Sequence, residues 1–383
     1  MNRLNQLTEI HQSGKPYIIY KSKKGFNLYT NFSKKIILNN RNIKSFLNKK
    51  NKKKSKDTDL FIGFFGYELL NNLIDVKIPK QKNLNFPKGI FYKPEKKIKL
   101  SNNLNYNFEN FKTGNFKINI NRKNYTKIFN KFKKKIKSGE TYQIKICTKY
   151  KTKSKINPLD FFSRLSDTNL APEAFMIKDN NYSIISCSPE TLIIKKGSDI
   201  STKPIAGTVK KTKQLNKIKA LNYFRKNLKE TKEHNMIVDM ERNDLSRICK
   251  VGSVKLSKQK IVEEYKDLFH YVSLIKGKLK KNINNFEIIK AMMPGGSVIG
   301  CPKINTLNLL NNQEKENRNI YTGSFGYIKF NGDMRFNIII RSILNFKNIS
   351  EISVASGVVV DSNANHEFNE NFLKAKALID LFK

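Results

Sequence analysis

The chain has 383 residues, of which 39% are hydrophobic, and this suffices for one large domain or two ordinary ones with a substantial core. Its 74 Lys and Arg against 31 Asp and Glu give a net charge of +43, which raises the question of a nucleic-acid partner. The lysines are dispersed among Asn and Ile without a helix-turn-helix, RNP-type or zinc-knuckle pattern, so we expect compositional bias and no nucleic-acid-binding face.

Membrane and metal-finger classes are also disfavoured. No stretch approaches the roughly 20 apolar residues of a membrane span, and the first residues lack a hydrophobic signal core, so we expect a cytoplasmic protein with no membrane partner. The four cysteines, at positions 147, 187, 249 and 301, are too far apart for CxxC zinc ligation. They are expected to be reduced thiols.

The first 120 residues contain short strand-like segments at 15–22, 34–40 and 60–70. The densest lysine run, 46–59, is expected to be a solvated loop between them. From residue 121 the pattern is clearer. A basic helix is predicted over 123–140, a strand over 141–150 and a helix around 158–167.

Two β-hairpins follow along the chain. The first covers 174–197 and turns at residues 179–181, and the second covers 323–346 and turns at Asn331-Gly332. A strand over 352–361 and a closing helix complete the pattern. Helices mixed with antiparallel hairpins predict an α+β fold.

Two Glu-x-x-Glu pairs, Glu230 with Glu233 and Glu367 with Glu370, stand out in this basic chain. In a helix, both members of a pair project from the same side. Either pair alone is compatible with a solvated helix face. Both lie in segments apolar enough to pack, however, and half-buried carboxylates need a cation. Mg²⁺ accepts such ligands and leaves room for an anionic substrate.

Other polar residues interrupt apolar segments. The Gly-rich segment 294–303 fails the P-loop spacing, yet it offers backbone N–H groups, Ser297 and Lys303 to an anion. The alternative there is an ordinary tight turn. Glu190, His270 and Arg341 lie in or beside strand-like apolar segments, where His270 could equally be a satisfied core histidine.

These segments together resemble the chorismate-utilising enzymes, with the large subunit of anthranilate synthase (component I) and aminodeoxychorismate synthase component I as the nearest types. The resemblance covers residues 121–383 and rests on nine motifs in the family's order, namely SPE, KPIAGT, EHNMIVDMERND, HYVS, PGGSVIGCPK, YTGSFGY, NIIIRS, SGVVVDS and EFNENFLKAKAL. It implies an anthranilate synthase-type fold in which antiparallel sheets pack as a sandwich with outer helices. Residues 1–120 would be a shortened N-terminal region and 121–383 the chorismate-binding catalytic domain.

The resemblance also implies a set of site residues. Mg²⁺ would be held by the four glutamates Glu230, Glu233, Glu367 and Glu370. Catalytic roles would fall to Glu190 as the acid for the leaving 4-hydroxyl, to His270 in proton transfer or orientation, and to Gln143. The substrate would contact Thr208, Ser297, Lys303, Tyr321, Arg341, the backbone at Gly357, and Lys374.

Two positions bear on the branch of the family. Gln143 stands where isochorismate-forming relatives carry a water-activating lysine, so ammonia is the expected nucleophile. Ala206 stands where many aminodeoxychorismate synthases carry a lysine nucleophile, which favours an anthranilate synthase, whereas GETYQI and MERNDLSRIC resemble the aminodeoxychorismate branch. No cysteine lies on a Gly-flanked elbow, so a separate glutamine amidotransferase subunit is expected to supply ammonia.

Overall fold

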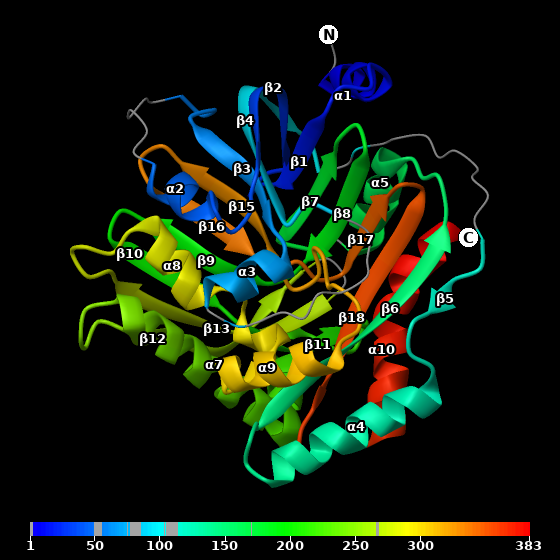
Figure 1. Ribbon diagram of the computed structural model, residues 1–383, viewed down its shortest axis with the longest axis vertical. Helices are drawn as coiled ribbons and strands as arrows, with labels where there is room; N and C mark the ends of the chain where they lie inside the picture. The colour runs from blue at the N-terminus through cyan, green and yellow to red at the C-terminus, as the bar shows by residue number, and fades with distance from the viewer. Residues whose placement is uncertain are drawn as a thin grey trace.

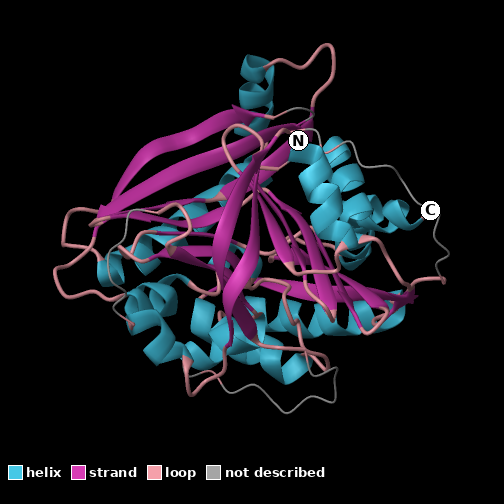
Figure 2. Ribbon diagram, turned by 90° about the horizontal axis from the view of Figure 1, so that it is seen from above, coloured by secondary structure: helices cyan, strands magenta, loops and turns pink. Residues whose placement is uncertain are grey.

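The computed structural model describes residues 3–49, 56–74, 76, 86–102, 104, 114–169, 171–265 and 268–383. Within these ranges every strand pairing is antiparallel, and the strands join into one continuous curled sheet. None of the helices in these ranges has the length and apolar character needed to cross a bilayer. Figure 2 shows the strands in the interior with most helices around them.

The first row of strands runs through β2, β1, β7, β8, β17, β18 and β6, with the short β5 and β14 paired to β6. Their bounds are Phe26–Ile37 (β2), Tyr17–Lys21 (β1), Glu173–Lys178 (β7), Tyr182–Ser188 (β8), Ser342–Phe346 (β17), Ile349–Val358 (β18), Gln143–Lys153 (β6), Lys117–Ile118 (β5) and Gly300–Cys301 (β14). This row ends on the side of the molecule where α10 lies (Figure 1).

The second row runs through β3, β15, β16, β9, β10 and β13, and β13 also pairs with β11 and β12. Their bounds are Leu60–Phe65 (β3), Ser324–Lys329 (β15), Met334–Asn337 (β16), Thr191–Lys196 (β9), Asp199–Lys203 (β10), Leu268–Lys278 (β13), Ile205–Lys210 (β11) and Lys255–Glu264 (β12). Strand β4 (Gly89–Leu100) pairs with β2 in the first row and β3 in the second, so it joins the two.

The two rows face each other across an apolar core. Phe175 of the first row stacks on Phe325 of the second with ring centroids 3.7 Å apart. Isoleucines, leucines and aromatic residues from both rows fill the same buried cluster. This packing confirms the predicted α+β class with antiparallel layers and outer helices.

Helices cover the outer faces of the sheet (Figures 1 and 2). In chain order they are α1 (Arg3–Gln12), α2 (Ile43–Asn48), α3 (Tyr67–Leu73), α4 (Arg122–Lys137), α5 (Pro158–Asn169), α6 (Lys217–Lys226), α7 (Leu228–Ile248), α8 (Asn285–Met292), α9 (Lys303–Gln313) and α10 (Ala364–Ile379), with 3₁₀ turns at Gly296–Val298 and Asp380–Phe382. Helices α5 and α10 pack on the first row, and α7 packs on β11 and β13 of the second.

The predicted hairpins are confirmed as β7–β8 and β15–β16. The predicted strand over 60–70 is wrong in its second half, because it ends at Phe65 and α3 begins at Tyr67. Gly66 is the extended N-cap of that helix, and the Glu68 carboxylate accepts the backbone N–H of Arg318 at 2.6 Å, which fixes the turn. The predicted loop over 46–59 is wrong at 46–48, which belong to α2, while 50–55 lie outside the described residues.

Strands from both sides of the expected division at residue 120 pair with one another. Strand β1 pairs with β7, and β3 pairs with β15. The N-terminal region therefore supplies strands to the same sheet as the rest of the chain. The division into two domains stays a prediction.

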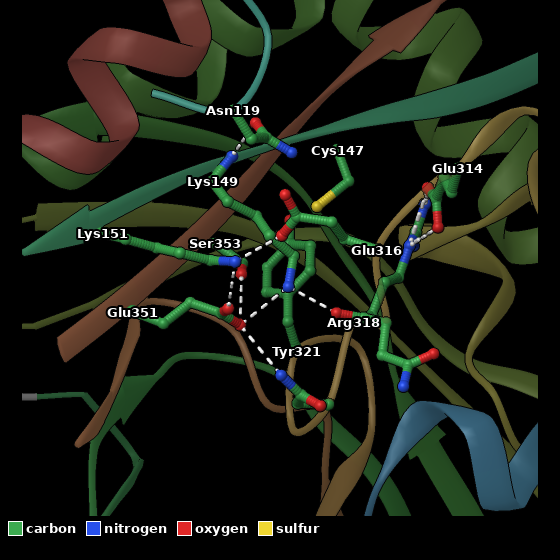
Figure 3. Close-up of polar contacts among 12 residues, drawn as sticks. Asn119, Cys147, Lys149, Lys151, Glu314, Glu316, Arg318, Tyr321, Glu351 and Ser353 are labelled. Carbon is green, nitrogen blue, oxygen red and sulfur yellow. Dashed lines mark hydrogen bonds and ion pairs between the residues drawn. The ribbon is translucent and has the colours of Figure 1, made fainter. Parts of the chain in front are cut away.

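A buried ionic network braces β6 and β18 beside the loop that carries Tyr321 (Figure 3). The Lys149 ammonium, on a side chain only 2% exposed, lies 2.8 Å from Glu351 Oε1. Arg318 is fully buried, holds Glu314 through both Nε and Nη2, and donates from Nη2 to the Lys145 carbonyl at 3.1 Å. Each buried cation of this network, Lys149 and Arg318, is therefore paired with a carboxylate.

We predict that Glu351→Ala lowers the free energy of unfolding by about 3–5 kcal/mol, because it leaves the Lys149 ammonium buried without a carboxylate. The control is Glu95→Ala, which removes an exposed partner of Lys93 and should cost less than about 1 kcal/mol. Urea unfolding of both variants tests this. Equal losses of unfolding free energy in the two variants would contradict the prediction that the buried ion pair contributes more to stability than the exposed one.

Candidate active site

Two helices carry the four glutamates, and each helix begins at a capping asparagine. The Asn227 side chain accepts the N–H of Glu230 at the start of α7, and the Asn363 side chain accepts the N–H of Asn365 and His366 at the start of α10. Glu230 and Glu367 therefore lie in first turns, where the helix dipole favours negative charge.

On α10, one histidine and two glutamates form a compact group of potential metal ligands. Ligand atoms of His366, Glu367 and Glu370 lie within 4.8 Å of one another. Glu367 is 1% exposed and accepts the Ser362 hydroxyl at 3.0 Å, while Glu370 pairs with Lys374 at 2.6 Å. Carboxylates in this arrangement fit a hard divalent cation such as Mg²⁺.

Glu233 of α7 faces β6. Its Oε1 accepts from Gln143 Nε2 and from Lys145 Nζ, both at 2.9 Å. Burial alone would raise the pKa of Glu233, but the Lys145 ammonium and these two hydrogen bonds lower it to about 2. Glu233 is therefore ionised throughout the neutral range.

Gly357 of β18 makes room for this group. It pairs with Lys145 across the sheet, and a Cβ at this position would lie 2.7 Å from Lys145 Nζ and 2.9 Å from Gln143 Nε2. Any larger residue would push both side chains away from Glu233. The glycine thus permits the contact between β6 and α7.

Glu190 follows β8 and is nearly fully buried. Ser297, in the 3₁₀ turn of the Gly-rich segment, donates to its Oε1 at 2.7 Å. Burial raises the pKa of Glu190 to about 7, although the Ser297 hydrogen bond and the Lys145 charge act against that rise. A carboxyl with this pKa can donate a proton near neutral pH.

His270 and Thr208 face each other on β13 and β11. The His270 Nδ1 lies 2.8 Å from the Thr208 hydroxyl. Burial, together with the smaller effect of the nearby Arg341 charge, lowers the pKa of His270 to about 4. The imidazole is therefore neutral at physiological pH, and it can orient a bound ligand or relay a proton.

Arg341 is a half-buried cation that immediately precedes β17. Its backbone adopts a φ of +50°, a conformation that L-residues rarely keep without a functional or packing reason. Within the described ranges no carboxylate forms an ion pair with its guanidinium, and burial lowers its pKa. A half-buried guanidinium without an ion-pair partner is suited to an anionic ligand.

A cavity of about 300 Å³ connects this cation with the acidic helix α10. Its polar lining includes Thr208, Arg341, Glu370 and Lys374, and its apolar lining includes Leu268 and Leu373. Four of the predicted site residues therefore share one cavity. Gln143 and Lys145 both contact Glu233, while Glu190, which accepts from Ser297, is affected by the Lys145 charge.

Two predicted residues lie apart from the cavity lining. Lys303 is buried in an ion pair with Asp244, so its ammonium already has an anionic partner. Tyr321 packs with Cys147 and Ala355 behind the cleft, and burial raises its pKa well above the usual value. Their roles as substrate contacts stay predictions.

Sequence analysis missed Lys145. The alternation of β6 places it on the same face as Gln143, two residues earlier, and this spacing was the available signal. Which carboxylate it would meet depended on the packing of α7 on the sheet.

Comparison with known proteins gives a consistent result. The sequence profile of the family described as chorismate binding enzyme matches residues 7–380. The chain is 35% identical over 266 residues to aminodeoxychorismate synthase component 1 of Bacillus subtilis (strain 168), a match covering 69% of this chain and 57% of that protein. It is 32% identical over 364 residues to anthranilate synthase component 1 of Buchnera aphidicola subsp. Pemphigus spyrothecae, covering 83% of this chain and 70% of that protein.

The fold is similar to that of anthranilate synthase component I from Streptococcus pneumoniae TIGR4, with a TM-score of 0.78, 25% identity, and coverage of 95% of this chain and 92% of that one. A structure described as a putative isochorismate synthase, DhbC from Bacillus anthracis, shares the fold at a TM-score of 0.76 and 18% identity, with 99% of both chains covered. Among the curated relatives, the match spans little more than half the length of several, including the Bacillus subtilis protein.

The pKa of Glu190 predicts a pH-dependent stability. Because the folded pKa is about 7 and the ordinary value is 4.5, the folded state binds this proton more tightly. Its contribution is present below about pH 4.5 and is lost as the pH rises to about 7. Relative to Glu190→Gln, the wild type should lose up to roughly 3 kcal/mol of unfolding free energy over this window. Urea unfolding at pH 5, 6, 7 and 8 measures it, and parallel pH profiles would contradict it.

Proposed function

The chain belongs to the family of chorismate-binding enzymes, and on this premise we propose that it is component I of an anthranilate synthase, which converts chorismate and ammonia to anthranilate and pyruvate. The observation that carries the proposal is the cavity lined by both Arg341, a half-buried cation without an ion-pair partner in the described chain, and Glu370 of α10. The relatives named anthranilate synthase component 1 support it.

Chorismate is a dicarboxylate, and the two ends of the cleft offer it different partners. The Arg341 guanidinium suits the enolpyruvyl carboxylate, because its planar fork matches a carboxylate through two hydrogen bonds. Glu230, Glu233, Glu367 and Glu370 would hold Mg²⁺. When bound, Mg²⁺ compensates the negative charge of the ring carboxylate.

The proposed reaction needs an acid and a nucleophile. Ammonia forms a bond at C2, the ring double bonds shift, and the 4-hydroxyl leaves as water with a proton from Glu190, whose burial raises its pKa to about 7 and so retains the proton in a substantial fraction of molecules near neutral pH. The amino intermediate then loses the C2 proton and pyruvate, which leaves the aromatic ring of anthranilate. Neutral His270, held by Thr208, can orient the substrate or relay a proton.

Gln143 bears on the choice of nucleophile. Its amide is held against Glu233 at 2.9 Å and cannot act as a base. Activation of water by this residue is therefore disfavoured, and ammonia, which needs no such base, is the expected nucleophile.

The nitrogen must come from outside the chain. Burial raises the pKa of the Cys147 and Cys187 thiols to about 12 and of Cys249 to about 11, and burial also raises the pKa of Cys301. A glutaminase needs an activated thiolate, which these environments disfavour. We propose that a separate glutamine amidotransferase subunit supplies ammonia, in keeping with the name component 1 carried by several relatives.

A second candidate is aminodeoxychorismate synthase component I. It is favoured by the 35% identity to the Bacillus subtilis protein of that name. Ala206, on β11, argues against it, since there is no lysine at this position to attack the ring. The two activities differ in the carbon that receives nitrogen.

We predict that the purified chain with chorismate, Mg²⁺ and an ammonium salt at alkaline pH forms anthranilate without a second enzyme. Glutamine alone should give no product. Chromatography with and without an aminodeoxychorismate lyase distinguishes the branches. Product that appears only after the lyase is added, as 4-aminobenzoate, would assign the chain to the second candidate.

We also predict that Glu370→Gln lowers turnover by at least about 100-fold while the fold is retained, because a metal-ligand carboxylate is lost from a half-exposed position. The matched control is Asp380→Asn, which removes an equally half-exposed carboxylate at the end of the same helix and should retain activity. Anthranilate fluorescence and thermal unfolding report the two effects. Wild-type turnover by Glu370→Gln would contradict the proposal that Glu370 is a metal ligand.

A further inference from the structure

Lys145 is a cation on β6 that contacts Glu233 of α7, and the proposed reaction gives it no role. Its ammonium lies 2.9 Å from Glu233 Oε1, and its side chain is only 12% exposed. Glu370 and Glu367 of α10 also act electrostatically on this ammonium. One side-chain cation therefore faces carboxylates from both helices.

The backbone of Lys145 is fixed from several sides. Its N–H donates to the Ile299 carbonyl at 3.0 Å, and its carbonyl accepts from the buried Arg318 guanidinium at 3.1 Å. Gly357 pairs with it on β18 and leaves space for the side chain. The ammonium can therefore move only as far as its four-carbon stem allows.

The carboxylates around Lys145 are the same ones that would hold the divalent cation. Mg²⁺ binds carboxylate oxygens at roughly 2.0–2.1 Å, closer than an ammonium does. An ammonium that stays beside Glu233 would repel the incoming ion at short range and in a partly desolvated site. Occupation of the site by one cation therefore disfavours the other.

We propose that Lys145 is a tethered competitor of the divalent cation, which holds Glu233 in the metal-free chain and lowers the chain's affinity for the metal. This inference rests on the proposed metal site between α7 and α10. The ammonium keeps the glutamates close together before the metal arrives. An anionic substrate offsets the additional positive charge, so metal and substrate favour each other's binding.

The test is the binding of Mn²⁺ to the purified chain without substrate, followed by electron paramagnetic resonance of the free ion. Lys145→Met keeps the length of the side chain and removes its charge. We expect it to bind Mn²⁺ at least about tenfold more tightly than the wild type. Lys145→Arg retains the charge and should stay within about threefold of the wild type.

Lys151→Met is the matched control, because Lys151 lies on the same strand face but pairs with Glu316 and Glu351 outside the cleft. It should leave Mn²⁺ affinity unchanged. Thermal unfolding is recorded for every variant, and Lys145→Gln provides the same test if the methionine variant is unstable.

The outcomes separate this inference from the proposed function. Suppose that Lys145→Met binds Mn²⁺ no more tightly than the wild type while Glu370→Gln weakens binding. The proposed metal site is then supported, and the proposal that Lys145 competes with the metal is wrong. Equal tightening in Lys145→Met and Lys145→Arg would also overturn it, because charge would then not be the cause. If Glu370→Gln leaves Mn²⁺ binding unchanged, the proposed metal site and the competition both fall.

Discussion

Glu233 of α7 and Glu367 and Glu370 of α10 all act on the Lys145 ammonium, and the folded chain can keep these carboxylates near one another only if positive charge shares the space. Like charges at short range in a partly buried site repel strongly. The chain meets this constraint with several devices. Lys145 holds Glu233, Lys374 holds Glu370, and the first turns of α7 and α10 place Glu230 and Glu367 at the positive ends of helix dipoles.

The other end of the cleft has the opposite character. Arg341 is half-buried without a carboxylate partner in the described chain, while burial raises the pKa of Glu190 to about 7, so that a substantial fraction of this carboxyl carries a proton near neutral pH. One chain thus contains ionised glutamates and a protonated glutamic acid within one site. Different environments set these states, as is needed when one group must bind a charge and another must donate a proton.

Sequence patterns were most informative where a local signal decides the structure. Asn331-Gly332 indicated one hairpin, and the Glu-x-x-Glu spacing singled out the two segments that form α7 and α10. Gly66 marks a limit of this approach. The run from Leu60 onward reads as one apolar segment in the sequence, whereas in the structure helix α3 begins directly after Gly66, and Glu68 of this helix accepts a hydrogen bond from the distant Arg318. Lys303 and Lys145 show it again. Their partners, Asp244 and Glu233, lie on α7, and only tertiary packing could reveal which lysine meets which carboxylate.

Strand β4 joins the two rows of the sheet through the nearby strands β2 and β3, but other strands of the N-terminal region have partners from distant parts of the chain. Strand β1 needs β7, about 160 residues later, and β3 needs β15, more than 250 residues later. During synthesis on the ribosome, β3 therefore waits for nearly the whole chain before its partner emerges. Contacts of such high sequence separation form slowly and leave apolar strand edges exposed meanwhile. Folding of this protein in the cell is thus expected to finish after translation, with a need for chaperones that a locally connected fold of the same size would not share.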